Sequence, residues 1–429
     1  MVNKYKLHLV SHTHWDREWY LTFQGFRIQL VKLIDRLLDI LDNNPEYKFF
    51  MLDGQTIVLE DYLAIRPQNK DRLKKYISSG RILVGPWYVL PDLFLVSGEA
   101  LIRNLMLGMS IAEEFGRVMK VGYMPDQFGF ISQMPQILKG CGLDNAVIWR
   151  GINGSPQELK SEFYWESPDG SQVLTLHLPD KYGYSSAANL PSTIKESYEM
   201  ITQVKDHLIP YATTNNILLM NGIDHMFPQA NLPQILDKIN RQLKDSRIVH
   251  STLPNLIKAI EYKRPLLKVK KGEFRETKVV DILRGTISTR MYIKQENEKT
   301  QTLLENWVEP WCSFAWVLGK EYPYSFLKAA WKLLLQNHPH DSICGCSMDE
   351  VHQEMMVRFL QAQQIGEEFI TESLSFIARS IRLDRQKEKE SFLIVFNPLN
   401  CEKTELVTTD ISFLHQDKVA NFELLDRES

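Results

Sequence analysis

Residues 6–16 read KLHLVSHTHWD, a short apolar run that ends in three polar side chains, His12, His14 and Asp16. A longer helical pattern, LVKLIDRLLDILDN at 30–43, follows it, and this order is typical of a β/α unit. Six further strand-like runs occur before residue 252: KFFMLDG (48–54), RILVGPW (81–87), VGYMPD (121–126), NAVIWRG (145–151), VLTLHLP (173–179) and ILLMNGID (217–224). Strands that alternate with helices predict an α/β fold with a mainly parallel sheet, and seven of them predict a seven-stranded β/α barrel.

Beyond residue 252 the pattern changes to long helices, at 300–320, 326–338 and 349–381, which predict a three-helix bundle. The charged run RLDRQKEKE (382–390) is typical of a linker. Strand-like runs then return: FLIVFNPLN (392–400) and TELVTTDISFL (404–414).

Two or three strands do not form a stable domain alone. We therefore expect the last region to be the truncated start of a β-rich region, or to pack on the bundle. The expected domains are a β/α-barrel catalytic domain at 1–265, the three-helix bundle as a middle domain at 266–385, and this β-rich region at 386–429.

Composition and charge exclude several classes of protein. The chain has 429 residues, of which 44% are hydrophobic and 24% charged, as in globular proteins. Its net charge is −3 and no dense basic run is interleaved with aromatics, so a nucleic-acid partner is not expected. No window approaches the ~20 apolar residues of a membrane span, and the N-terminus lacks the apolar core of a signal peptide. We expect a cytoplasmic protein without membrane association. Its five irregularly spaced cysteines predict reduced thiols.

Polar or aromatic residues end most of the predicted strands. In parallel α/β folds the carboxyl ends of the strands meet at one rim, where functional residues gather. The residues at these ends include Asp53, Trp87, Asp126, Arg150 and Asp224. The sequence therefore predicts a functional site at this rim.

His14 and Asp16 are the sharpest local signal, because imidazole nitrogen and carboxylate oxygen are both good zinc donors. Two ligands do not hold a zinc ion, so the others must come from Asp126 or from the cluster His338-Pro339-His340-Asp341. Pro339 ends the preceding helix and lets His340 reach back over the rim. The ordinary alternative is a strand-end histidine bonded to a backbone carbonyl.

Cys344 and Cys346 suggest a second kind of metal site, a closed structural zinc site made by two thiolates and two histidines. The CxC pair lacks the usual gap of two to four residues, and no second cysteine pair completes a four-sulfur site. We therefore interpret both cysteines as small buried hydrophobic residues.

Glycoside hydrolysis uses two carboxyl groups in different environments, one as nucleophile and one as proton donor. Asp126, beside a metal and Arg150, would stay ionised as a nucleophile, whereas Asp224, at the end of an apolar run, would act as proton donor. A helix N-cap or an Asx turn is the structural alternative for either residue. Of the tryptophans, Trp15, Trp19 and Trp87 lie at strand ends and are expected to line a sugar pocket.

These motifs together resemble glycoside hydrolase family 38, the retaining, zinc-dependent α-mannosidases. The segments that carry the resemblance are SHTHWDREW (11–19), GPW (85–87), MPDQFG (124–129), WRG (149–151), NGID (221–224) and NHPHDSICG (337–345). They follow the family's order. The segments HWDREWY (14–20), LDGQT (52–56) and GPWY (85–88) are most similar to bacterial mannosylglycerate hydrolases.

The resemblance implies one zinc ion bound by His14, Asp16, Asp126 and His340. It implies Asp126 as nucleophile and Asp224 as acid/base, although the family often has two adjacent carboxylates where this chain has Ile223-Asp224. The expected substrate-binding residues are Trp19, Trp87, Arg150 and Asp341.

The resemblance also sets the expected substrate and architecture. The substrate is a small carbohydrate, an α-mannoside such as mannosylglycerate, its 6-phosphate, or α-mannosides of glycans. A seven-stranded barrel and a three-helix bundle precede large β domains in the family. A homo-oligomer is left open.

Two other functions remain open on the sequence. His12 and His14 form the HxH pattern of metal-dependent amidohydrolases and deacetylases, in which zinc activates water. The site could also bind carbohydrate without turnover. Whether His12 or Asp16 joins His14 separates the amidohydrolase from the mannosidase.

Overall fold

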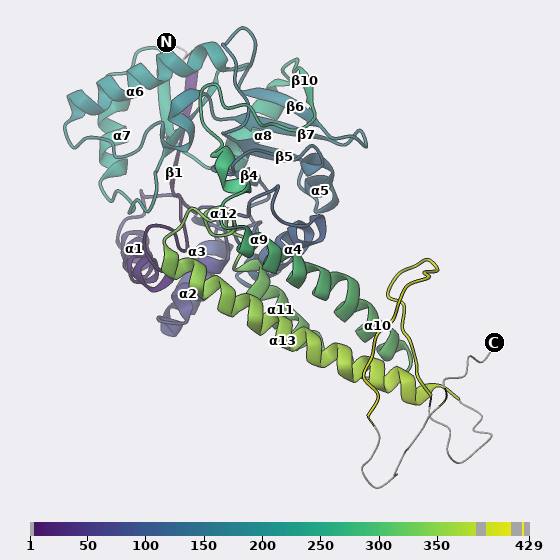
Figure 1. The fold of residues 1–429 in the computed structure, drawn as a ribbon. Helices are drawn as coiled ribbons and strands as arrows, with labels where there is room; N and C mark the ends of the chain where they lie inside the picture. Colours follow the sequence, from purple (N-terminus) through teal and green to yellow (C-terminus); the bar gives the residue numbers. More distant parts are fainter. Residues whose placement is uncertain (1–3, 383–391, 413–422, 424–429) are drawn as a thin grey trace.

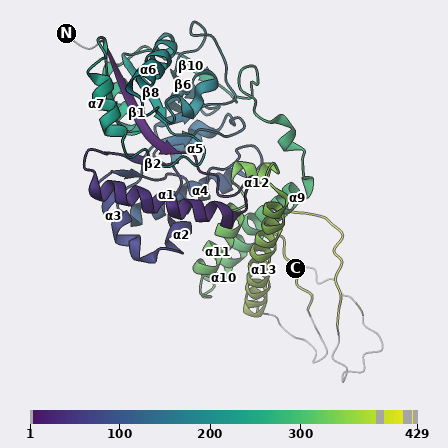
Figure 2. The same cartoon turned by 90° about the vertical axis from the view of Figure 1, so that its left-hand side faces the viewer.

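The structure is a computed structural model that describes residues 4–382, 392–412 and 423. Figures 1 and 2 show a rounded α/β body, from which a long helical part extends to one side. The mixed α/β class predicted from the sequence is confirmed.

The first sheet is built around β1 (Tyr5–Thr13), which carries the stretch that opens the sequence. Its order is β3 (Ile82–Leu83), β2 (Phe50–Leu52), β1 and β8 (Asn216–Asn221), and β9 (Ser246–His250) also pairs with β1. All of these pairings are parallel. The carboxyl ends of β1, β2 and β8 therefore lie at one edge.

The second sheet has the order β10 (Val269–Lys271), β6 (Glu162–Glu166), β7 (Gln172–His177), β5 (Asn145–Ile148) and β4 (Gly122–Met124). Each of the seven predicted runs contains a strand. No ladder joins the two sheets within the described residues, so the predicted seven-stranded barrel is not confirmed. β3 and β4 are end strands of the two sheets and would have to pair to close a barrel, but β3 is only two residues long. Pro86 follows it closely and has no N–H for a ladder, and one backbone bond, Met119 N to Val84 O, connects this region to the segment before β4.

Three described strands, β6, β9 and β10, are absent from the sequence prediction. β6 runs antiparallel to β7, and the turn between them contains SPDGS at 167–171, with Gly170 at φ +87°. A Pro-Asp-Gly turn between two apolar runs is a hairpin signal that could have predicted β6.

Helices cover the sheets: α1 (Phe23–Asn43), α2 (Ile57–Leu63), α3 (Lys70–Ser78), α4 (Gly98–Glu114), α5 (Met134–Gly140), α6 (Ile194–Leu208), α7 (Leu232–Asn240) and α8 (Leu253–Lys263). α1 begins after Thr22, whose hydroxyl accepts a hydrogen bond from the N–H of Gly25. Its apolar face, at helical spacing, is buried in the main core.

The helical part comprises α9 (Met291–Thr302), a π-helical turn (Leu303–Val308), α10 (Glu309–Val317), α11 (Tyr324–Leu335), the short α12 (His340–Cys344) and α13 (Asp349–Ser380). α13 packs along α9, α10 and α11 (Figure 1). Helices lie where the sequence predicted them, but the first begins at Met291 and not near residue 300. No described helix is both long and apolar enough to cross a membrane.

The last region differs from the prediction. Residues 392–412 carry no strand, although strands were expected at 392–400 and 404–414. Two strands on their own are at best marginally stable in water. The ring of Phe396 instead lies 5.3 Å from that of Trp311 in α10. The predicted linker beyond Arg382, and residues 413–414, lie outside the described residues.

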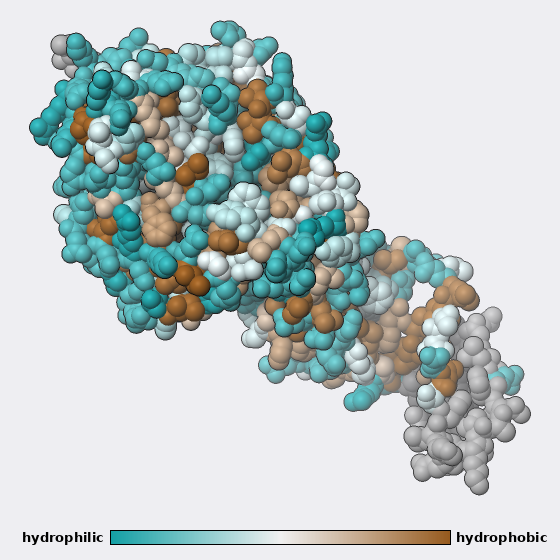
Figure 3. Space-filling model, turned by 60° about the vertical axis from the view of Figure 1, so that its left-hand side comes forward, coloured by the Kyte–Doolittle hydropathy of each residue, from teal (hydrophilic) through white to brown (hydrophobic). Residues whose placement is uncertain are grey.

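Hydrophobic side chains are unevenly distributed on the surface. In Figure 3 the α/β body is mostly teal and white with scattered brown, whereas brown atoms occupy much of the far end of the helical part. Exposed residues of α10 and α11 include Phe314, Trp316 and Phe326. That end is the more apolar part of this face.

The packing of α1 predicts a difference between two substitutions in one helix. Leu37 is fully buried and Ile28 is 58% exposed. We expect Leu37→Ala to lower the free energy of unfolding by about 2–5 kcal/mol, because it leaves a cavity in the core. Ile28→Ala should change it by less than about 0.5 kcal/mol. Urea unfolding followed by circular dichroism measures both, and equal losses would contradict the burial of this face.

Candidate metal centre and active site

His14 lies directly after β1, where the strand delivers it to the rim. Its Nδ1 lies 2.9 Å from Oδ2 of Asp53, which follows the neighbouring strand β2. The same Oδ2 accepts hydrogen bonds from Trp15 N at 2.8 Å and Gln55 Nε2 at 2.9 Å. A carboxylate at Nδ1 leaves Nε2 to act as a metal ligand. Asp53 is a positioning residue that the sequence analysis placed at the rim without assigning it a role.

His340 is held in a similar way from the other side. It is the first residue of α12, directly after Pro339, and its Nδ1 lies 3.2 Å from the carbonyl oxygen of Leu90. Its backbone N–H donates to the same carbonyl. The two histidine rings lie 5.5 Å apart, centroid to centroid. A residue 326 positions along the chain from His14 therefore shares its site, as the sequence analysis expected.

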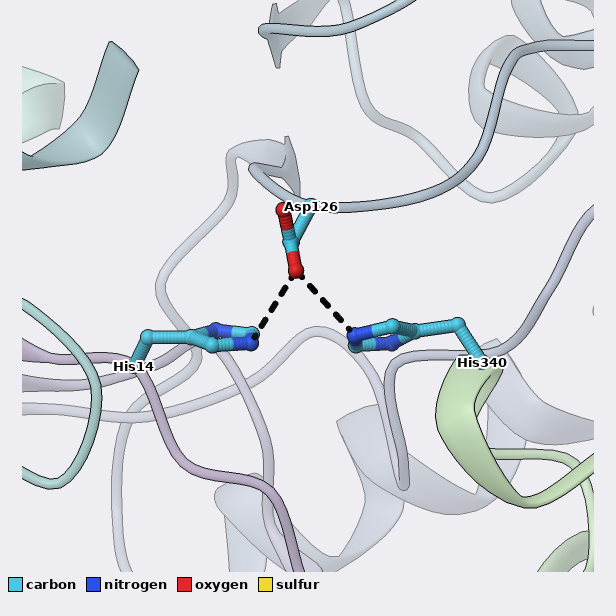
Figure 4. Close-up of side chains that lie close together, drawn as sticks. All are labelled: His14, Asp126 and His340. Carbon is cyan, nitrogen blue, oxygen red and sulfur yellow. Dashed lines mark ion pairs between the residues drawn. The ribbon is translucent and has the colours of Figure 1, made fainter. Parts of the chain in front are cut away.

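Asp126 lies between the two histidines, as Figure 4 shows. Its Oδ2 is 3.9 Å from His14 Nε2 and 3.6 Å from His340 Nε2. Its Oδ1 accepts a hydrogen bond from Arg150 Nε at 2.8 Å. Arg150 therefore holds one carboxylate oxygen while the other faces the imidazoles.

Asp16 and Asp341 complete the cluster. Oδ1 of Asp16 is 3.1 Å from His14 Nε2 and 3.6 Å from His340 Nε2. Oδ2 of Asp341 is 3.9 Å from His340 Nε2, and its Oδ1 accepts from the thiol of Cys346 at 3.1 Å. Every one of these acidic side chains is buried.

Buried negative charge dominates the electrostatics of the cluster. Burial acts to lower the pKa of His340, but the carboxylates of Asp341, Asp16 and Asp126 outweigh it and raise that pKa to about 9. Burial raises the pKa of Asp341 to about 7. Burial also opposes ionisation of Asp126, yet His340 and Arg150 bring the pKa of Asp126 below its usual value. Such a site favours the binding of a cation.

The residues fit a divalent metal ion. Ligand atoms of His14, Asp126 and His340 lie within 4.8 Å of one another, and so do those of Asp16, His340 and Asp341. Nε2 of His340 is buried without a hydrogen-bond partner, since the Asp16 and Asp126 oxygens at 3.6 Å are beyond hydrogen-bond distance. An unpartnered buried nitrogen is costly unless something coordinates it. Two imidazoles with carboxylates are a donor set that suits zinc.

Asp224 reaches the same site from β8. It forms an isolated parallel bridge with His14, and its Oδ1 accepts a hydrogen bond from Tyr184 Oη at 2.8 Å. The Tyr184 ring lies 5.1 Å from that of His14. Burial, with Asp126 and Asp224 nearby, raises the pKa of Tyr184 well above its usual value. Tyr184 was not predicted, because nothing in its local sequence distinguishes it.

The predicted tryptophans separate into two groups. Trp19 is partly exposed, with its ring 5.0 Å from that of Tyr20. Trp87 is fully buried and its indole N–H donates to Tyr123 O, so it belongs to the core and offers no face to a sugar. Trp15 is also buried, against Phe26. Strand-end position did not separate these environments.

His12 does not join the cluster. Its Nε2 lies 2.8 Å from the carbonyl oxygen of Tyr184, so the ordinary interpretation of a strand-end histidine holds for it. Asp16, and not His12, lies beside His14, which disfavours the HxH arrangement. The thiols of Cys344 and Cys346 donate to Asp92 and Asp341 respectively.

Comparison with known proteins gives consistent matches. The profile described as "Glycosyl hydrolases family 38 N-terminal domain" matches residues 4–277, and "Alpha mannosidase middle domain" matches 281–377. The "Putative mannosylglycerate hydrolase" of Halalkalibacterium halodurans is 39% identical over 403 residues, covering 90% of this chain and 44% of that protein. Human "Alpha-mannosidase 2C1" is 27% identical over 374 residues, covering 85% and 34%.

Among solved structures, an α-mannosidase from Enterococcus faecalis V583 matches with a TM-score of 0.85 and 37% identity, covering 88% of this chain and 43% of that one. The chain thus spans less than half the length of these relatives. On the match to residues 4–277 and this degree of identity, the chain belongs to glycosyl hydrolase family 38.

Proposed function

We propose that this chain is part of a retaining, zinc-dependent α-mannosidase. Residues 1–265 form its catalytic domain, and residues 266–385 contribute one zinc ligand. One observation carries the proposal: side chains from the end of β1, the end of β4 and the start of α12 converge on a buried point where His340 Nε2 has no partner. Two carboxylates with different neighbours accompany it: Asp126, 3.6 Å from His340 Nε2, and Asp224, bonded to Tyr184, whose ring lies 5.1 Å from that of His14.

His14, Asp16, Asp126 and His340 would hold the zinc ion. When bound there, zinc would supply charge stabilisation by gripping adjacent hydroxyls of the mannose ring. Asp53 and the Leu90 carbonyl would keep both imidazoles oriented toward it. Trp19, Arg150 and Asp341 would bind the sugar, whereas Trp87 is fully buried and would not contact it.

Asp126 acts as the nucleophile in this proposal. Arg150 and His340 favour its ionised form, so it attacks the anomeric carbon and forms a mannosyl-aspartate ester. Asp224 protonates the departing glycosidic oxygen, and Tyr184 orients it by donating to one oxygen. In the second step Asp224 takes a proton from water, which attacks the ester and releases mannose with retained configuration.

The proposed substrate is mannosylglycerate, because the relative from Halalkalibacterium halodurans carries that name and is 39% identical. Its 6-phosphate and α-mannosides of glycans are the other candidates. Human "Alpha-mannosidase 2C1", at 27% identity, is the more distant match.

Zinc titration of the metal-free chain tests the metal site. We expect calorimetry to show one high-affinity zinc site per chain. His340→Ala should raise the zinc Kd by more than about 100-fold, because it removes a direct ligand. His12→Gln is the matched control, since glutamine can still donate to the Tyr184 carbonyl. Loss of affinity in His12→Gln, with none in His340→Ala, would instead support the amidohydrolase arrangement.

The role of Asp224 predicts a dependence on the leaving group. Asp224→Asn should lower kcat/KM for mannosylglycerate by about 10²–10⁴-fold, because the glycosidic oxygen then leaves unprotonated. The loss should be much smaller with 2,4-dinitrophenyl α-mannoside, whose leaving group needs no proton. Asp237→Asn, on the surface of α7, should change neither value. Binding of mannosides without any product from the unmodified protein would indicate a non-catalytic carbohydrate-binding protein.

Retention predicts the first product. Proton NMR during hydrolysis of mannosylglycerate should show α-mannose before mutarotation produces the β-anomer. Early β-mannose would exclude a covalent intermediate on Asp126. Turnover of α-mannobiosides without turnover of mannosylglycerate would overturn the proposed substrate and leave the mechanism intact.

A further inference from the structure

Glu18 and Arg358 form a buried ion pair close in the chain to a proposed metal ligand, Asp16. Glu18 lies two residues after Asp16 and is fully buried, and Arg358 lies in α13 with 9% of its surface exposed. Arg358 Nη1 donates to Glu18 Oε2 at 3.0 Å, and Nη2 donates to Oε1. This is a bidentate pair, in which the planar guanidinium fixes both distance and orientation.

The same two side chains also hold both flanks of His340. Ser342, two residues after His340, donates through Oγ to Glu18 Oε1 at 3.0 Å. On the other flank, Asn337 Oδ1 accepts from Arg358 Nε at 2.6 Å. Asn337 is fixed in turn, because its Nδ2 donates to the carbonyl of Met355 in α13 at 3.0 Å.

The pair therefore connects two chain segments that each carry a metal ligand. One segment holds His14 and Asp16, and the other holds His340. A separate backbone bond, Met348 N to Trp19 O at 2.9 Å, joins the same two segments.

Stability alone does not account for this arrangement. Removing two charges from water costs about as much as their mutual attraction returns, so an apolar pair of similar volume would stabilise the fold as well or better. What the fork provides is a defined position. Ligands of a metal site must be held within about 0.5 Å of their productive geometry, which neighbouring hydrogen bonds supply.

We propose that Glu18 and Arg358 are positioning residues that set the zinc affinity of this chain, by fixing the His340 segment against the segment of His14 and Asp16. The inference rests on the proposed zinc site. On this proposal α13 supplies none of the four proposed zinc ligands, but its Arg358 fixes the relative position of the two segments that carry three of them.

Zinc affinity and stability, measured on the same variants, test this role. Arg358→Met and Glu18→Gln should each raise the zinc Kd by about 10–100-fold, as loss of an outer hydrogen bond does. Each should also destabilise the fold: Arg358→Met leaves Glu18 with only Arg17, whose Nη1 is 3.9 Å from Glu18 Oε2, and Glu18→Gln removes the carboxylate that faces Arg358. The double variant removes both charges of the bidentate pair, so it should be more stable than Arg358→Met or Glu18→Gln alone while zinc affinity stays low. Recovery of both together would mean that the pair acts on stability alone.

Two further variants make the test independent of misfolding. Arg358→Lys keeps the charge and loses the fork, and we expect it to stay folded with a zinc Kd about 10-fold higher. Lys205→Met is the control. Lys205 is 5% exposed and pairs with Asp245, and it belongs to α6, a helix that lies apart from α12 in Figures 1 and 2. It should leave the zinc Kd within twofold of the unmodified chain.

The outcomes separate this inference from the function it rests on. If the unmodified chain binds no zinc, the proposed metal site is wrong. If the unmodified chain binds zinc, and folded Arg358→Lys and double variants bind it as tightly, the site stands and the positioning role is overturned.

Discussion

The concentration of buried acidic side chains around two imidazoles is the constraint on which the rest of the structure depends. Asp16, Asp126 and Asp341 lie within 4 Å of His340 Nε2, and Asp53 lies on the far side of His14. Such a cluster is stable only if each charge is paired or bound to a cation. Arg150 pairs one oxygen of Asp126. The remaining inward-facing oxygens and nitrogens fit the donor set of a divalent metal ion, which is why we propose zinc there.

The two imidazoles depend on a shared support. Gln55 donates to Asp53 and to the Trp15 carbonyl, and its Oε1 accepts from Leu90 N at 3.3 Å. Asp53 orients His14, and the Leu90 carbonyl orients His340. One buried glutamine thus connects the groups that position both histidines. The α/β body and the helical part meet at this network, so the site belongs to neither alone.

Most of the fold could be predicted from residue patterns, and the failures have local causes. All seven predicted runs contain a strand, because each combines an apolar run with turn residues. Closure into one barrel was predicted from the strand count and is not confirmed, since closure depends on ladders between short strands such as β3, which residue patterns do not encode. Trp87 shows the same limit at a single residue: its position after a strand suggested a pocket wall, and packing against β4 buried it.

Residue chemistry by itself determined which side chains are candidates for binding a metal and for glycoside hydrolysis, because donor type and strand-end position are local properties. Residue chemistry alone left both His12 and Asp16 open as companions of His14. The tertiary structure places Asp16 there, as the family resemblance implied, because His12 Nε2 contacts the Tyr184 carbonyl while Asp16 Oδ1 lies 3.1 Å from His14 Nε2. The supporting roles that we propose for Asp53, Tyr184, Glu18 and Arg358 likewise follow only from the three-dimensional structure. Each acts through a hydrogen bond to a residue distant in sequence, and no local pattern encodes such a contact.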